Sequence, residues 1–401
     1  MATITDGYHL NAGGREFTQI LSVVVDGTTV GPHASRAIIE LKKITGFIQV
    51  FVDLVIVCVG LFGNIFSIIV FSRCRKKDAA SIFYLTFLAV SDSGNLLMYV
   101  VVIWSGYGLK ELSSGGIAFK MITFSTMTCK LFSYLLDVFA FSSAWTIIVF
   151  SLERVVAVWW PLKTSSLLTP SRRRTAILVL VAVALVSNIP VLVFSEIFIE
   201  KGFTKCFYNL KGFSGDGKFL FVFFFLTTKN YALPCILLLT LNSVLVVGIV
   251  MSKKSAVRTS NSKTEAREMS CVINLLIVST IFILFNIPFV TLWTYYNYEN
   301  FIHGLARQSR DEVDMLHGIG AFVVSLTMIN YSMNFIIYSK SLDFYRNEGR
   351  KILQSLLCCC RHTAGSGAEE SVLSSIESPR MTMTLTSENL PRKQTTSVKN
   401  I

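Results

Sequence analysis

The amino-acid sequence predicts an all-α membrane protein, a seven-transmembrane helix bundle followed by a C-terminal amphipathic helix. Hydrophobic residues make up 52% of the 401 residues and charged residues only 15%, whereas soluble domains carry about 25% charged residues. Seven apolar runs reach the length of about 20 residues that a helix needs to cross a bilayer, while a membrane strand needs only about ten. Helices are expected because they pair their own backbone groups in lipid. The runs lie near 46–71, 80–106, 126–159, 175–198, 219–251, 269–294 and 313–338.

The runs divide the chain into an N-terminal segment and a membrane domain. Residues 1–45 lack the basic and then apolar pattern of a signal peptide, and we expect them to form an extracellular segment. Residues 46–340 form the seven-transmembrane domain. The loops after the first, third and fifth runs carry more Lys and Arg than the opposite loops, which places the N-terminus outside and the C-terminus inside. The formal charge of +12 then indicates a basic inner face against anionic membrane lipids, and the scatter of these charges argues against nucleic-acid binding.

Two further segments are expected on the inner side. Residues 341–360 alternate apolar and charged side chains and are expected to form an interfacial amphipathic helix. It ends in Cys358, Cys359 and Cys360, which are candidates for palmitoylation. Residues 361–401 are rich in Ser and Thr, and we expect a disordered cytoplasmic tail.

The cysteines indicate one disulfide. Cys129 opens the third run and Cys206 lies in the loop after the fourth, so both fall on the outer, oxidising side. The other seven cysteines lie inside runs or on the inner side. A Cys129–Cys206 bond is therefore expected, with two free thiols as the alternative.

Several charged residues lie in or at the ends of the apolar runs. Glu153 and Arg154 close the third run, in "SLERVVAVWWPLK", where they are either a membrane-edge anchor or a switch. Asp92 lies deep in the second run, so its carboxylate needs polar partners in the bundle interior. Helical spacing offers a stripe of such partners on the seventh run, with more on the first and third: Asn330, Asn334, Tyr338, Asn64 and Ser143.

Seven helices, an outer N-terminus and a disulfide from the third helix to the second outer loop resemble the rhodopsin-like G-protein-coupled receptors, and four sequence motifs add to this resemblance. "GNIFSIIVF" resembles the helix-one motif of that family, "FYLTFLAVSD" the helix-two motif and "LERVVAVWWPL" the Asp-Arg-Tyr motif. "NYSMNFIIYS" resembles the Asn-Pro-x-x-Tyr motif, with Phe335 in place of the proline. The phrases "FAFSSAW" and "LFNIPF" further resemble invertebrate neuropeptide receptors of the FMRFamide type. Asn286 and Asn242 depart from the family, which usually has Trp and Tyr at these places.

The resemblance implies roles for the charged residues and for partners. Glu153, Arg154 and Tyr338 would form the switch toward a heterotrimeric G protein. Asp92, Ser143, Asn330 and Asn334 would form a pocket for a sodium ion, with a hydrogen-bonded polar core without an ion as the alternative. Arrestin and receptor kinases would act on the tail, for which a passive role is the alternative. The implied location is the plasma membrane.

The outer halves of the runs favour a peptide ligand. Acidic and aromatic residues gather there and suit a peptide with basic and aromatic side chains, although each aromatic could serve helix packing instead. Asp137 is one residue out of register for the amine-binding Asp of the family, whose place holds Leu136, and this argues against a monoamine. The seventh run has no Lys for a retinal Schiff base. Lys229 should face the bundle and pair with a carboxylate or with an acidic ligand group. The candidate ligand-binding residues are Asp137, Tyr134, Glu196, Asp53, Trp293 and Tyr99.

Other function classes fit less well. The sequence contains no metalloprotease motif, phosphate-binding Gly loop or paired catalytic carboxylates, so we expect no enzyme and no cofactor apart from the possible sodium ion. A transporter or channel would show matching repeats with Gly- or Pro-broken helices, which the runs do not show. A receptor of the same fold for a lipid or another small molecule remains the nearer alternative.

Overall fold

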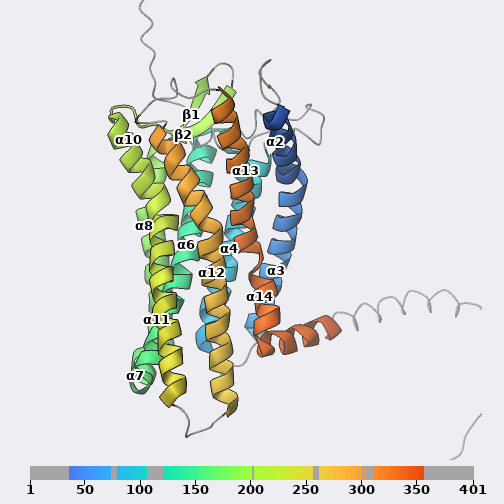
Figure 1. The fold of residues 1–401 in the computed structure, drawn as a ribbon, viewed down its shortest axis with the longest axis vertical. Coiled ribbons are helices and arrows are strands. Elements are labelled where there is room, and N and C mark those ends of the chain that lie inside the picture. The colour runs from blue at the N-terminus through green and yellow to red at the C-terminus, as the bar shows by residue number, and fades with distance from the viewer. Residues whose placement is uncertain are drawn as a thin grey trace, which may run out of the picture. The chain divides into compact units, whose positions relative to one another are not determined.

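The computed structural model describes seven stretches of the chain, residues 36–73, 79–105, 121–200, 203–255, 262–299, 302 and 310–355. The chain forms two units, Met1–Arg350 and Lys351–Ile401. Long helices run side by side in the first unit (Figure 1). Six of them are long and apolar enough to cross a membrane, and the bent pair of α13 and α14 makes a seventh if it counts as one span. The predicted seven-helix bundle is therefore confirmed.

The spans correspond to the seven predicted runs in order. Three of the spans contain a π-helical segment: η1 and η5 lie inside the first and fifth spans, and η3 ends the second. The helical elements are α2 (Arg36–Phe47), η1 (Ile48–Val52), α3 (Asp53–Arg73), α4 (Ala79–Tyr99), η3 (Val100–Trp104), α6 (Thr126–Trp159), α8 (Pro170–Ser187), α9 (Ile189–Phe194), α10 (Gly215–Val222), η5 (Phe223–Ala232), α11 (Leu233–Ser255), α12 (Ser262–Tyr298), α13 (Arg310–Ser332) and α14 (Asn334–Ser341).

The helices extend beyond the apolar runs at several ends. The first begins at Arg36, ten residues before the apolar run, because polar residues can continue a helix outside lipid. The fifth helix continues to Ser255 and the sixth begins at Ser262, so both extend into the polar, basic segment between the fifth and sixth apolar runs. A short helix in the loop after α6, α7 (Pro161–Leu167), was not predicted; it has Pro161 at its first position, where a missing N–H costs nothing.

A β-hairpin follows the fourth span. Strands β1 (Ser195–Glu200) and β2 (Phe203–Tyr208) pair antiparallel, with Ile197 opposite Cys206. Cys206 forms the predicted disulfide with Cys129, which lies in the first turn of α6. Ser125 caps that helix through the backbone N–H of Thr128. The disulfide therefore ties the hairpin to the start of α6 and rules out the two free thiols.

The seventh span bends by 41° between Ser332 and Asn334 without a proline. The first helix packs closely against this break, because a Cβ on Gly60 would clash with the Ser332 hydroxyl and a Cβ on Gly63 would clash with the Phe335 ring. Asn64 was expected beside Asp92, but its amide donates instead to the carbonyl of Tyr331 at 3.0 Å. Helix one therefore stabilises the bend at the position where Phe335 replaces the family's proline.

The amphipathic helix is present over residues 343–355. In its part within the first unit, Phe344 and Tyr345 are buried, and the Tyr345 hydroxyl lies 2.9 Å from that of Ser67 in α3. Burial raises the pKa of the Tyr345 phenol, and the hydrogen bond with Ser67 offsets part of the rise. Cys358–Cys360, the predicted tail 361–401 and most of the predicted N-terminal segment 1–45 lie outside the described residues.

Candidate functional site: charged clusters inside the bundle

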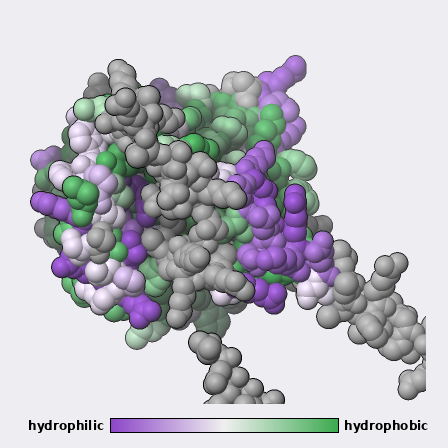
Figure 2. All heavy atoms as spheres, turned by 90° about the horizontal axis from the view of Figure 1, so that it is seen from below, coloured by the Kyte–Doolittle hydropathy of each residue, from purple (hydrophilic) through white to green (hydrophobic). Residues whose placement is uncertain are grey.

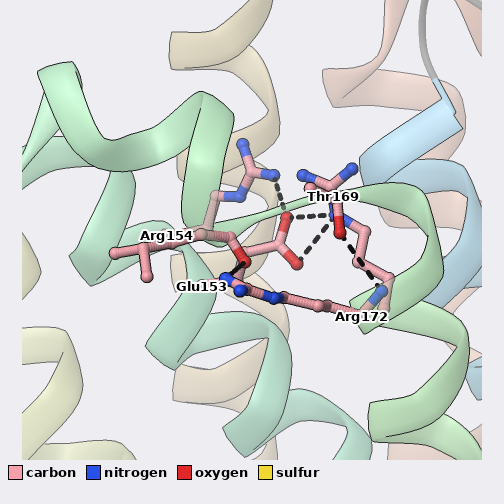
Figure 3. Close-up of polar contacts among 6 residues, drawn as sticks. Glu153, Arg154, Thr169 and Arg172 are labelled. Carbon is pink, nitrogen blue, oxygen red and sulfur yellow. Dashed lines mark hydrogen bonds and ion pairs between the residues drawn. The ribbon is translucent and has the colours of Figure 1, made fainter.

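The inner end of α6 holds a buried charge cluster (Figure 3). The Arg154 guanidinium donates through Nη2 to Glu153 Oε1 at 3.1 Å. Arg173 of α8, which the sequence analysis missed as a partner, donates from Nε to both oxygens of Glu153 at 2.9 and 3.0 Å. Glu153 and Arg154 are 4% and 7% exposed. A simple membrane-edge anchor would keep its charges in water, so this pair is better described as an internal ion cluster.

The residues at the start of α8 fix the position of Arg173 beside Glu153. Thr169 accepts the backbone N–H of Arg172 at 3.4 Å and Pro170 occupies the first position of α8, which together fix where the helix begins. The Arg172 guanidinium donates to the carbonyls of Ser166 and Leu167. Arg172 thus binds backbone carbonyls of the segment before α8, whereas Arg173 binds the carboxylate of Glu153.

Tyr338, the third predicted switch residue, is fully buried on α14. Its ring packs against Phe71 and Tyr345, with ring centroids 5.5 and 5.9 Å apart. Among the described residues its hydroxyl has no hydrogen-bond partner. A buried unpaired hydroxyl costs free energy, so an arrangement of the helices that offers it a partner would be favoured.

Asp92 of α4 lies at the centre of the polar core. Its Oδ1 accepts the Ser143 hydroxyl at 2.6 Å, and its Oδ2 accepts the amide of Asn334. Asn330 is buried one turn earlier on helix seven. Asp92 therefore joins helices two, three and seven, through two of the partners that helical spacing offered.

Helix six is held by two further side-chain hydrogen bonds in its inner half. Ser279 donates to Asn242 at 2.9 Å, and Ser341 of α14 donates to Asn274 at 2.6 Å. Asn242, which departs from the family, thus has a defined partner. Asn286, the other departure, donates to the Phe282 carbonyl of its own helix.

Two of the six candidate ligand residues bond to each other instead of standing free. The Tyr99 hydroxyl donates to Asp53, which also accepts the Ser325 hydroxyl at 3.0 Å. Asp53 and Tyr99 are 0% and 1% exposed. This group joins helices one, two and seven in their outer halves, and its burial leaves little surface for a ligand.

Asp137 lies in a more open environment on α6. Its Oδ1 accepts the amide of Asn230 at 3.1 Å, and the residue is only half-buried. Lys229 was expected to pair with a carboxylate; instead its ammonium donates to the side chain of Asn188 and to the Ser187 carbonyl, at the end of α8. That position suits a cation because helix C-termini carry partial negative charge.

The other three candidates lie at the outer end. Tyr134 donates to the Leu185 carbonyl of α8 at 2.9 Å. Glu196, on β1, is half-buried and accepts the amide of Asn209 at 2.6 Å. Trp293 is 3% exposed and stacks on Phe289 within an aromatic cluster that also includes residues of β2. Asp137 and Glu196 thus remain the accessible carboxylates of the six.

Comparison with known proteins places these features in a wider group. Residues 63–338 match the family described as 7 transmembrane receptor (rhodopsin family). The chain is 27% identical over 317 residues to the somatostatin receptor type 5 of Bos taurus, which covers 79% of this chain and 77% of that protein. It is 26% identical over 330 residues to the somatostatin receptor type 2 of Mus musculus, with 80% of each covered. A shorter match, 29% over 144 residues, joins 36% of this chain to 37% of the growth hormone secretagogue receptor type 1 of Rattus norvegicus.

Proposed function

Because the chain belongs to the rhodopsin family of seven-transmembrane receptors, we propose that it converts binding of an extracellular neuropeptide into activation of a heterotrimeric G protein. It is a multi-pass membrane protein, and its family consists of signalling receptors and not of enzymes, transporters or channels. The observation that carries the proposal is the buried Glu153–Arg154 pair at the inner end of α6. An ion pair held between helices is a restraint that a change of helix packing can release.

A peptide ligand is supported from the outer side. Two of the similar receptors are named for somatostatin, a peptide. Asp137 has one amide as its described hydrogen-bond partner and keeps accessible surface, so a cationic group of a ligand could pair with it directly. Glu196 on the hairpin offers a second carboxylate. Neuropeptides of the FMRFamide type are the class to screen first, and a lipid or other small molecule is the alternative ligand.

Coupling to a G protein is supported from the inner side. Figure 2 views the molecule from below and shows hydrophilic side chains on both sides of the grey atoms. On α7, Leu162 is 95% exposed, next to Lys163 in the sequence. An exposed apolar side chain beside a basic one suits an anchor in a partner protein. With this side facing the cytoplasm, the receptor lies in the plasma membrane and its N-terminus is extracellular. Arrestin and receptor kinases would act on the tail. Palmitoylation would take place at Cys358–Cys360, which follow the described helix.

The family's sodium ion fits the residues around Asp92. Asp92 and Ser143 present a carboxylate and a hydroxyl, and the amide of Asn334 donates to Asp92. The side-chain oxygens of the buried Asn330 and Asn334 would complete a set of the hard oxygen ligands that such a cation prefers. A bound ion would supply positive charge beside Asp92. The residues themselves hold helices two, three and seven together, and a change in their packing would bias the bundle between two states.

Arg154→Ala tests the proposal. Cells expressing the receptor with a promiscuous G protein are first screened against a neuropeptide library, and nucleotide exchange is measured with the peptide that responds. The variant should bind that peptide but lose agonist-driven exchange, because the group released toward the G protein is gone.

Arg172→Ala is the matched control, since the Arg172 guanidinium bonds only to loop carbonyls among the described contacts. It should retain exchange. Wild-type exchange in Arg154→Ala would reject the role of Arg154, and activation by a neutral lipid without any peptide response would overturn the peptide.

A further inference from the structure

Glu153 is bound more closely by Arg173 than by its neighbour Arg154. Arg173 contacts both carboxylate oxygens, at 2.9 and 3.0 Å, whereas Arg154 contacts only Oε1, at 3.1 Å. The side chain of Glu153 is 3% exposed and that of Arg173 is 14% exposed. Tyr84 of α4 also lies within hydrogen-bonding reach of the carboxylate. The single buried negative charge of Glu153 thus pairs with two guanidinium groups.

Helix formation does not account for the position of Arg173. The first turn of α8 contains no acidic residue and includes Arg172 and Arg173, and Arg174 comes directly after it. Basic residues at a helix N-terminus are repelled by the positive end of the helix dipole. The carboxylate of Glu153, which comes from another helix, offsets this repulsion for Arg173 alone among the described contacts.

Arg154 has little else to hold it. Its Nε has no hydrogen-bond partner among the described residues, and its guanidinium carbon lies 5.2 Å from the centre of the Phe150 ring. When Arg154 leaves, Glu153 does not become an unpaired buried charge, because Arg173 still contacts both oxygens. An unpaired buried charge is the largest penalty for breaking such a pair.

We propose that Arg173 is a positioning residue of the switch: it shares the Glu153 carboxylate and so weakens the hold of Glu153 on Arg154. The inference rests on the proposed function, since it concerns the regulation of the same pair. Removing Arg173 gives the whole carboxylate to Arg154 and favours the inactive arrangement. A plain helix-to-helix clamp would do the opposite, because its loss would free the inner ends of α6 and α8.

Basal nucleotide exchange, measured in membranes, distinguishes the positioning role of Arg173 from a helix-to-helix clamp. Arg173→Ala should lower basal exchange by about fivefold, the order expected when one charge-assisted hydrogen bond changes partner. Arg172→Ala, which removes the same charge one residue earlier, should leave it unchanged. An increase in Arg173→Ala, or an equal decrease in both variants, would overturn the proposal.

The Glu153→Gln background tests whether the effect passes through Glu153. Without the carboxylate there is nothing to share, so adding Arg173→Ala should not change exchange further. A direct contact between Arg173 and the G protein would instead lower exchange equally in both backgrounds, and that result would also overturn the proposal.

Thermal unfolding of the purified receptor gives a readout that needs no G protein. Arg154→Ala should lower the midpoint more in the Arg173→Ala background than in the wild type, because Glu153 then has no cation left. Equal losses would reject the sharing of Glu153. If the wild type shows no exchange with any peptide, the proposed function fails, while this measurement still decides the inference.

Discussion

The two halves of α6 each carry one carboxylate, and the two carboxylates lie in different environments. At the inner end, Glu153 is 4% exposed and contacts two guanidinium groups. In the outer half, Asp137 is half-buried and accepts one amide, while the nearby ammonium of Lys229 is directed to the end of α8.

The difference indicates what each acid can do. A buried carboxylate that is fully paired can act only through a change of partners within the protein. A partly exposed carboxylate without a cation in direct contact can accept one from outside. The inner end is therefore built for an internal rearrangement, and the outer half for a ligand.

The largest expected effect comes from removing the disulfide that anchors the hairpin to the outer end of α6. Cys206→Ser removes the disulfide that joins the hairpin to α6, and losing a native disulfide costs about 2–5 kcal/mol. Surface expression and peptide binding should fall together, as measured by antibody labelling of intact cells and by radioligand saturation.

Cys58→Ser is the control, because Cys58 is a free cysteine on an exposed part of α3. It should express and bind like the wild type. Normal binding by Cys206→Ser would mean that the hairpin is held by its packing alone.

A smaller effect is expected when only the charge of Asp137 is removed. Asp137→Asn should weaken an agonist peptide that contains Arg by about tenfold or more, because a charged contact shielded from water is worth a few kcal/mol. An analogue with citrulline in place of that Arg should lose much less. Asp216→Asn, at the exposed start of α10, serves as the matched removal of an outer charge and should leave the affinity for both peptides unchanged.

Equal losses for both peptides would show that Asp137 acts on the fold through Asn230 and not on the ligand. The comparison between the two halves of α6 would then change, since both acids would be internal restraints.

The sequence predicted what depends on local patterns. Run length gave the spans, and the restriction of Cys129 and Cys206 to the outer side gave the disulfide. Helical spacing also brought Ser143 and Asn334 to Asp92, because residues on one helix face point in one direction.

The partners that were missed come from other helices and need three-dimensional placement. Arg173 is twenty residues from Glu153 in the sequence, and only the crossing of α6 and α8 joins them. The three arginines at the start of α8 were a usable signal, since they oppose the helix dipole. Lys229 was expected to pair with a carboxylate or with an acidic ligand group because charge alone was considered, whereas its ammonium contacts the neutral side chain of Asn188.

Two tryptophans of α6 repeat the comparison between the outer and inner parts of the helix. Both donate from the indole nitrogen to a backbone carbonyl of the fifth span: Trp145 to Lys229 at 3.0 Å and Trp159 to Val244 at 3.3 Å. The acceptors differ. In the π-helical register the N–H of Leu233 bonds to the Thr228 carbonyl, so the next donor in line for the Lys229 carbonyl is residue 234, a proline without an N–H. Val244 lies inside the regular helix α11.

The smallest expected effect is therefore on stability, and it should differ between the two tryptophans. Trp145→Phe keeps a ring to stack on Phe141 but leaves the Lys229 carbonyl without a donor, which costs about 1–3 kcal/mol. Trp159→Phe removes the same indole donor from a carbonyl that has its own helical partner, and the cost should be smaller. Thermal unfolding of the purified variants measures both. Equal midpoints would mean that the Lys229 carbonyl finds another donor when Trp145 is lost, and that the π-helical segment does not depend on α6.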